Sequence, residues 1–268
     1  MANVDYLLVG GGGTGHSSSD SAWTSGGGGA GGVKEGSTDL SSGSHSITVG
    51  QAAPPNTDAN GDDTSAFSVT AHGGGLSGIS ATAGSNGGCG GGAGTGSGSS
   101  GGKGNGTTGE GTVGSPVRGG NGGTANNKNS LQDAAGGGGG ASEEGGNASD
   151  NFGGKGGDGY SSSITGTALT YGGGGPGGVR SGTTGGFGSC TSGFGQGGAG
   201  VAGISSSNSG TPGVAIIRYR TGDFGPDCSG GTKSYATIGG VSYTIHTFTS
   251  DGTLILTENN NGFLFFMP

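Results

Sequence analysis

The chain contains few charged, aromatic and cysteine residues for its length of 268 residues. Only nine residues are Lys or Arg and the formal net charge is −8, so we expect no binding to nucleic-acid backbones. No run of 18 apolar residues occurs, so we expect no membrane-spanning helix and no membrane insertion. The three cysteines, Cys89, Cys190 and Cys228, lie far apart, which indicates neither a disulfide framework nor a zinc site.

Glycine is abundant instead. The 78 Gly and 7 Pro residues are a composition that, without a period, is typical of disorder. Segments rich in Val, Ile, Tyr, Phe and Thr interrupt the glycine, however, and such segments favour β-strands. They are "NVDYLLVG" (3–10), "SHSITVG" (44–50), "SAFSVTAH" (65–72), "GVAIIRYR" (213–220) and "VSYTIHTFTSDGTLILTE" (241–258). Within the last segment, Ser250-Asp251-Gly252 predicts a tight hairpin that returns through Leu254-Ile255-Leu256.

Runs such as "GGGGAGG" (26–32) and "GGGGPGG" (172–178) have no side chains with which to pack. They can still be ordered as extended polyglycine II helices, which have three residues per turn and hydrogen-bond sideways to one another. We therefore predict an irregular all-β fold in which short antiparallel strands flank a glycine-rich, polyglycine II-like core. The predicted organisation is a glycine-rich domain over 1–222, then a C-terminal strand hairpin and apolar tail over 223–268.

Three stretches resemble the glycine-rich domain of bacteriophage tail and fibre proteins: "VDYLLVGGGG", "GGGGAGGVKEGSTDLSSGSHSITVG" and "GTPGVAIIRYRTG". The likeness covers 4–50 and 172–222, and implies a hairpin over 33–50. "YTIHTFTSDGTLILTE" resembles a strand pair that commonly precedes the first strand in tandem copies, so here it completes either its own domain or a neighbouring subunit. A more distant resemblance is to the receptor-binding adhesins that cap long tail fibres.

These resemblances imply a non-enzymatic virion protein of a phage tail fibre or tail tip. Its expected partners are a protein or glycan receptor on the host surface, other virion proteins and further copies of itself. The loops expected to bind the receptor are 14–25, 124–135, 141–152 and 158–171, with Trp23, Phe152, Tyr160 and Tyr171 as contact residues. A second role is open for each of them: Trp23 can equally well plug the core, and for Phe152, Tyr160 and Tyr171 capping the ends of the glycine core is the favoured role. Alternative functions are a purely structural capsid or tail protein and, less favoured, an ice-binding protein.

Motifs for catalysis or cofactors are weak. "GGKGGDGYS" (153–161) fits a calcium-binding nonapeptide with Asp158 as ligand, but such sites need tandem copies and one is present. Neither Gly-Lys pair is followed by Ser or Thr, so no phosphate-binding loop is indicated. His16, Asp20 and the nearby serines, and the pair Glu143-Glu144, are best interpreted as solvated loop residues. We expect no enzyme activity, no metal and no cofactor.

The last residues, "GFLFFMP" (262–268), form an apolar tail after a polar "ENNNG" stretch. A tail this short cannot span a membrane and is expected to bury its side chains elsewhere. The favoured interpretation is that Phe263, Leu264, Phe265 and Phe266 dock onto a neighbouring subunit or another virion protein. The alternative is folding back onto the chain's own domain.

Overall fold

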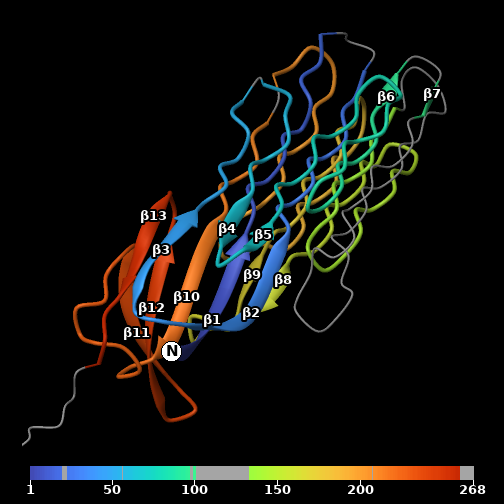
Figure 1. Ribbon diagram of the computed structural model, residues 1–268. Coiled ribbons are helices and arrows are strands. Elements are labelled where there is room, and N and C mark those ends of the chain that lie inside the picture. Colours follow the sequence, from blue (N-terminus) through green and yellow to red (C-terminus); the bar gives the residue numbers. More distant parts are fainter. Residues whose placement is uncertain (20–22, 56, 97–98, 101–132, 207, 260–268) are drawn as a thin grey trace, which may run out of the picture.

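A computed structural model describes residues 1–19, 23–55, 57–96, 99–100, 133–206 and 208–259. The molecule is elongated, with two β-sheets at one end and a bundle of glycine-rich chains at the other (Figure 1). No helix is assigned within the described ranges, and none there is long and apolar enough to cross a membrane. The expectation of an all-β chain with short antiparallel strands is therefore confirmed.

The larger sheet has five antiparallel strands in the order β11-β12-β10-β1-β2. Their bounds are β1 (Ala2–Val9), β2 (Val33–Leu40), β10 (Val214–Arg220), β11 (Thr232–Ile238) and β12 (Val241–Phe248). β1 and β10 lie in the middle and are the most apolar strands, since each is buried on both faces of the sheet.

The second sheet has the order β13-β3-β4-β5 and is also antiparallel. Its strands are β3 (Gly43–Thr48), β4 (Thr64–Ala66), β5 (Val69–Ala71) and β13 (Gly252–Leu256). Two short hairpins, β6 (Thr95–Gly96) with β7 (Ser99–Ser100) and β8 (Tyr160–Ser162) with β9 (Leu169–Tyr171), complete the described strands.

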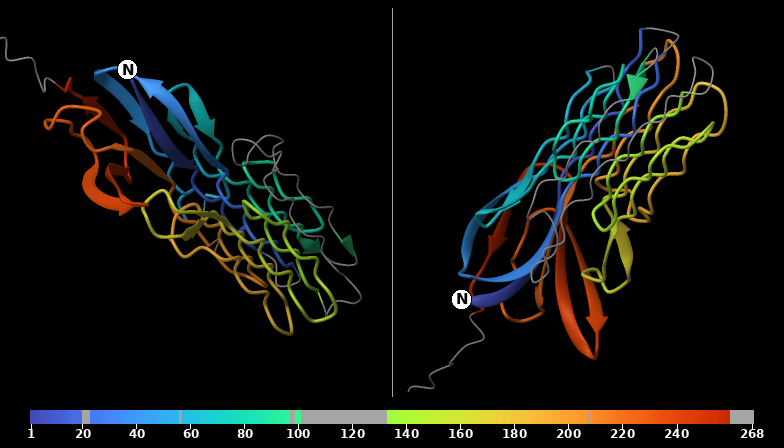
Figure 2. Two further views of the ribbon diagram at one scale, coloured as in Figure 1. Left: turned by 90° about the horizontal axis from the view of Figure 1, so that it is seen from below. Right: turned by 90° about the vertical axis from the view of Figure 1, so that its right-hand side faces the viewer.

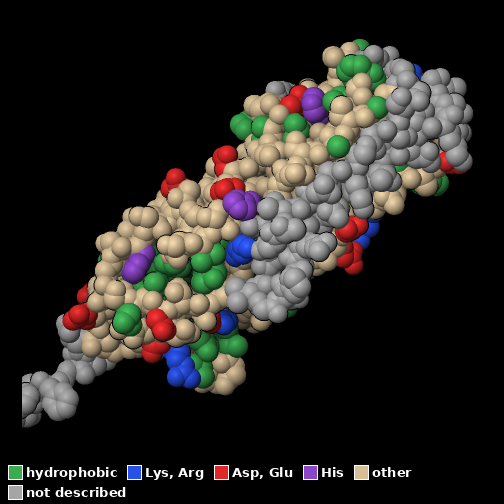
Figure 3. Space-filling view, turned by 45° about the vertical axis from the view of Figure 1, so that its right-hand side comes forward, with side chains coloured by type: hydrophobic (Ala, Val, Ile, Leu, Met, Phe, Trp, Pro, Cys, Tyr) green, Lys and Arg blue, Asp and Glu red, His purple; other side chains and the backbone are tan. Residues whose placement is uncertain are grey.

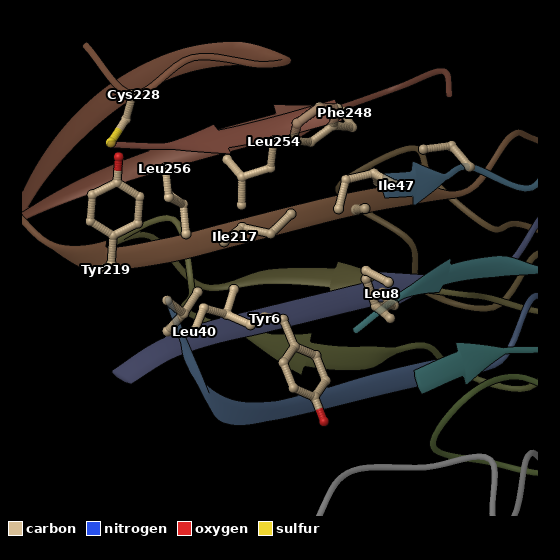
Figure 4. Packing of buried hydrophobic residues seen from close by; sticks show 14 of the residues in the cluster. Tyr6, Leu8, Leu40, Ile47, Ile217, Tyr219, Cys228, Phe248, Leu254 and Leu256 are labelled. Atoms are coloured by element: carbon tan, nitrogen blue, oxygen red, sulfur yellow. The ribbon is translucent and has the colours of Figure 1, made fainter. Parts of the chain in front are cut away.

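The two sheets enclose the main apolar core (Figure 4). Alternate residues of β1 and β10 point into it, among them Leu8, Ile217 and Tyr219, and β13 contributes Leu254 and Leu256 from the opposite sheet. The intervening residues of β1 and β10 face the other way and form a second core with the β8–β9 hairpin. The period of two along each strand thus supplies both cores.

Two hairpins expected from the sequence are not formed. β2 and β3 belong to different sheets, so the implied hairpin over 33–50 is wrong. β12 and β13 also belong to different sheets, so no hairpin closes at Ser250-Asp251-Gly252. Both edges of β12 are already occupied by β10 and β11, and the Asp251 carboxylate accepts the amide of Val49 at 2.8 Å, beside the strand that pairs with β13.

Residues 223–259 are not a separate unit in space. β11 and β12 extend the larger sheet beyond β10, and β13 pairs with β3 of the same chain. The missed strand β11 forms the hairpin with β12 through Gly239 and Gly240, whose φ angles are +58° and +81°. Positive φ at both turn residues is what a tight hairpin turn requires.

The strands lead directly into the glycine bundle. β1 ends at Val9 and is followed by Gly10, and Gly32, Gly172 and Gly213 adjoin β2, β9 and β10 in the same way. Figure 2 shows from two further sides that the bundle continues the long axis of the sheets. The sheets therefore fix where each glycine segment begins.

The segment 25–32, which we call the central segment, is surrounded by six others. They are 10–15, 72–78, 88–95, 135–141, 172–178 and 195–201. The central segment hydrogen-bonds to all six, and each of the six also bonds to its two neighbours around the ring. This hexagonal arrangement of laterally bonded chains is a polyglycine II lattice.

Hydrogen bonding along the central segment has a period of three. The amides of Ser25, Gly28 and Gly31 donate to 195–201, those of Gly26, Gly29 and Gly32 donate to 72–78, and those of Gly27 and Ala30 donate to 135–141, all at 2.8–3.0 Å. The other three neighbours donate to carbonyls of the central segment. Three residues per turn point successive amides at three different partners, which is how this buried backbone is satisfied.

Glycine is required at these positions because the backbones touch. A β-carbon at Gly12 or at Gly27 would lie 1.9 Å from a carbonyl oxygen of another segment. Contacts this short exclude any side chain without a shift of the backbone. The abundance of glycine is thus a packing requirement of the lattice.

Candidate functional site

Several loops close the lattice at the end remote from the two sheets, and we call the described residues of 16–24, 148–152, 179–183 and 202–208 the tip loops (Figure 1). Loop 16–24 joins the lattice segments 10–15 and 25–32, which run in opposite directions, and loops 179–183 and 202–208 follow the lattice segments 172–178 and 195–201. Within the described residues, the hydrogen bonds of loops 16–24 and 202–208 connect them to each other: Ser18 bridges Ser205, and the Gly203 amide donates to the Trp23 carbonyl at 3.0 Å. The lattice therefore gathers loops that are far apart in sequence.

Trp23 is half-buried, and Ile204, which follows the glycine that bonds to the Trp23 backbone, is more exposed. The Ile204 side chain is 75% exposed, and it follows Gly203, whose φ is +68°. Hydrophobic side chains at this end are visible beside polar and acidic ones in the space-filling view (Figure 3). Trp23 was predicted from the sequence as a contact residue and Ile204 was not, although both are isolated apolar residues in polar loops between glycine runs.

Phe152 occupies a second place at the tip. Its side chain is 56% exposed, and its backbone bridges Ser149 within its own loop and Thr183 in the neighbouring loop. Asn151 beside it has a φ of +61°, a conformation that Asn adopts more readily than most residues. The Phe152 side chain is thus carried on a turn that is tied to the neighbouring loop, and more than half of its surface stays exposed.

Tyr160 and Tyr171 do not lie at the tip. They are cross-strand partners in the β8–β9 hairpin, next to the five-stranded sheet. Tyr171 is 1% exposed and packs in the second core, so its expected role in receptor binding is wrong. Tyr160 is half-buried against the same core, and burial raises the pKa of each phenol to about 12. The end of loop 158–171 that carries Tyr160 and Tyr171 therefore lies beside the five-stranded sheet and not among the tip loops.

Two other predicted sites, loop 124–135 and the apolar tail, lie largely or wholly outside the described residues. Loop 124–135 lies outside the described residues up to 132, and its last residues, Asp133–Ala135, are buried. Phe263, Leu264, Phe265 and Phe266 also lie outside them.

Asp133 is fully buried, and within the described structure neither carboxylate oxygen has a hydrogen-bond partner. Burial raises the pKa of this carboxyl, and Arg180 partly opposes the shift.

The described polar groups around His16 do not form a catalytic arrangement. The Ser17 hydroxyl donates to the Asp58 carboxylate at 2.6 Å, and His16 Nδ1 lies 2.8 Å from the Ser17 carbonyl oxygen. A serine nucleophile would need to donate to the imidazole instead. Asp58 also accepts the Ser17 amide at 2.7 Å, so this cluster fixes the start of loop 16–24. Asp20 lies outside the described residues.

Asp158, the ligand suggested by the nonapeptide match, is engaged by protein groups. Its Oδ1 accepts the Lys155 ammonium and the Ser189 amide, each at 2.8 Å. These hydrogen bonds, led by that from Lys155, lower the pKa of the carboxyl. Across the described ranges no group of three or more His, Cys, Asp or Glu residues is placed to hold a metal.

The family model described as "Glycine-rich domain" matches residues 1–220. No curated protein and no solved structure matches the chain. The matched range contains every lattice segment described above and ends at the last residue of β10. This chain therefore belongs to the glycine-rich domain family.

Proposed function

We propose that this chain is a non-enzymatic virion protein of a phage tail fibre or tail tip, which binds the host cell surface through its tip loops. One observation carries the proposal: a laterally bonded lattice presents several loops together at the end remote from the sheets. Binding residues commonly lie on loops that a rigid scaffold positions. The phage context rests on the resemblance of the strand and glycine motifs.

The composition of the tip suits recognition. Trp23, Phe152 and Ile204 provide apolar contact area, while the surrounding positions are mainly Ser, Asn, Thr and Gly. Rigid aromatic anchors among small polar residues are typical of adaptable binding surfaces. The receptor, a protein or a glycan, would contact this surface, and the sheet end would face other virion proteins or further copies of the chain.

Two exposed isoleucines provide a matched test. Ile204 lies at the tip and Ile255 lies in β13 at the sheet end, where its side chain is 41% exposed. Phage particles that carry Trp23→Ala with Ile204→Ser are expected to adsorb to host cells at least about tenfold more slowly, as for loss of anchor residues. Particles that carry Ile255→Ser are expected to adsorb normally.

Antibody labelling in the electron microscope would first establish where the protein lies on the particle. Label at fibre or tail tips is expected. Label spread over the capsid, or normal adsorption of the tip variant in fully assembled particles, would support the purely structural alternative instead.

A further inference from the structure

A pocket of about 310 Å³ opens at the sheet end, beside the loop 221–231 that joins β10 to β11. Aromatic rings form much of its wall. Tyr219 and Phe224 are buried, and their rings pack edge to face with the centroids 5.1 Å apart. The Tyr235 side chain is 68% exposed. Lys233 is held at the wall because its ammonium donates to the carbonyls of Pro226 and Cys228. The pocket is therefore largely apolar and has a fixed rim.

The chain itself leads to this pocket after β13. The Gly225 amide donates to the Thr257 carbonyl at 2.8 Å, and the Asn259 side-chain amide donates to the Gly222 carbonyl. A β-carbon at Gly225 would lie 2.4 Å from the Glu258 carbonyl oxygen, so glycine permits this close approach. Asn259, the last described residue, is itself part of the pocket wall.

The sequence that follows matches the pocket in chemistry and in reach. Asn260-Asn261-Gly262 separates Asn259 from the apolar run Phe263–Phe266. Four residue steps span at most about 14 Å in an extended chain, which is enough to return a Phe ring from the rim into the pocket. Aromatic rings pack well edge to face against one another, and Tyr219, Phe224 and Tyr235 offer such partners.

We propose that the segment Phe263–Phe266 docks into this pocket of its own chain. Asn259 anchors the segment at the rim, so docking within one molecule takes place at a far higher effective concentration than docking onto another copy. Docking would remove from water both the apolar side chains of the segment and the exposed ring of Tyr235. The proposal concerns the sheet end and is independent of the function proposed for the tip.

Disulfide trapping in the full-length chain tests this placement. The variant carries Tyr235→Cys and Phe265→Cys, with Cys190→Ser to remove the half-buried native thiol. Mild oxidation is expected to give an intramolecular cross-link, which shifts mobility on a non-reducing gel without doubling the mass. A matched variant with Ile204→Cys in place of Tyr235→Cys is expected not to cross-link. A covalent dimer would overturn the proposal in favour of docking onto a second copy, and absence of any cross-link would overturn it outright.

Hydrogen exchange provides a second test without new cysteines. In the full chain, Phe263→Ser with Phe265→Ser is expected to accelerate amide exchange in 221–228 at least fivefold. Phe152→Ser, which also removes an exposed Phe but at the tip, is expected to leave that exchange unchanged. Unchanged exchange in the tail variant would contradict the proposal.

Discussion

Gly27 faces the carbonyl oxygen of Gly175 so closely that a β-carbon on Gly27 would lie 1.9 Å from it. Both residues belong to the lattice, and the Gly27 amide is at the same time bonded to the Gly136 carbonyl at 3.0 Å. The backbone of Gly27 therefore cannot move away from Gly175 without breaking that bond. The lattice is fixed from several sides at once.

Replacing Gly27 with Ala should consequently destabilise the protein. The methyl group would have to displace backbone, and we expect a loss of about 3 kcal/mol in the free energy of unfolding. Urea unfolding followed by far-UV circular dichroism measures this loss.

Gly186→Ala is the matched control. A β-carbon at Gly186 meets nothing within 4 Å, and this glycine does not have a positive φ. Its unfolding free energy should be unchanged or higher by about 0.5 kcal/mol, because Ala reduces the entropy of the unfolded chain. Equal effects of the two substitutions would contradict the steric origin of the glycine requirement.

Because of His246, we expect the folded protein to lose stability in mild acid. The imidazole is fully buried, Nδ1 lies 2.7 Å from the Gly230 carbonyl oxygen, and Nε2 lies 3.1 Å from the Tyr219 hydroxyl. Nδ1 must donate to the carbonyl, so in the neutral ring Nε2 is the acceptor and the Tyr219 hydroxyl donates to it. Burial lowers the pKa of the imidazole below its ordinary value of 6.5; the hydrogen bond to Gly230 partly opposes this shift, and the charge of Lys233 adds to it.

Below pH 6.5 the unfolded chain then binds a proton that the folded chain excludes. The free energy of unfolding should fall as the pH drops from 6.5, by up to about 1.4 kcal/mol per pH unit for this one group. His246→Gln should flatten this pH dependence, whereas His45→Gln, on a half-buried residue of β3, should not. Parallel pH profiles for wild type and His246→Gln would exclude this residue as the cause.

Arg218 connects the larger sheet to the β8–β9 hairpin. Its Nε and Nη2 donate to one Asp5 carboxylate oxygen at 3.1 and 2.6 Å, and its Nη1 donates to the Ile164 carbonyl at 3.1 Å. Lys cannot reproduce these simultaneous bonds, so Arg218→Lys should cost about 1 kcal/mol of unfolding free energy at this partly exposed site. Arg220→Lys, two residues along the same strand at an exposed position, should cost less than about 0.5 kcal/mol. Thermal unfolding compares the two, and similar shifts would remove the special role of Arg218.

Substitutions of Tyr171 and Phe152 should distinguish a residue that stabilises the fold from one that is free to bind a receptor. Tyr171→Ala empties a fully packed site, so we expect a loss of about 3 kcal/mol in unfolding free energy. Phe152→Ala, on an exposed tip residue, should change stability by less than about 0.5 kcal/mol. If Phe152→Ala destabilises the protein as strongly as Tyr171→Ala, its ring supports the fold and is not free for a receptor.

The glycine lattice could be predicted from the sequence because it depends on local composition. Seven or so residues without side chains have few ordered states available, and polyglycine II is one of them. Strands such as β1 and β10 were equally clear from their apolar residues. What the local pattern does not contain is which strand pairs with which: Asp251-Gly252 has the composition of a tight turn, yet the chain there crosses between sheets.

The local sequence pattern also does not show which of the candidate binding residues lie at the tip. Trp23, Phe152, Tyr160 and Tyr171 all lie beside glycine runs, so their sequence surroundings are alike. Their positions in the fold differ because successive glycine segments alternate in direction, so that only every second turn of the chain lies at the tip. Tyr160 and Tyr171 flank a turn at the sheet end, where the β8–β9 hairpin covers apolar residues of β1 and β10.

The hexagonal hydrogen bonding also determines how the molecule would carry a mechanical load. A pull on a tip loop acts along the lattice axis, whereas the bonds run sideways from each chain to its neighbours. Such a force shears many bonds together instead of unzipping them one after another. Because the glycine segments continue covalently into β1, β2 and β10, the tension passes on to the five-stranded sheet. A scaffold with few side chains in its interior, and with no helix among its described residues, can in this way be stiff along one direction.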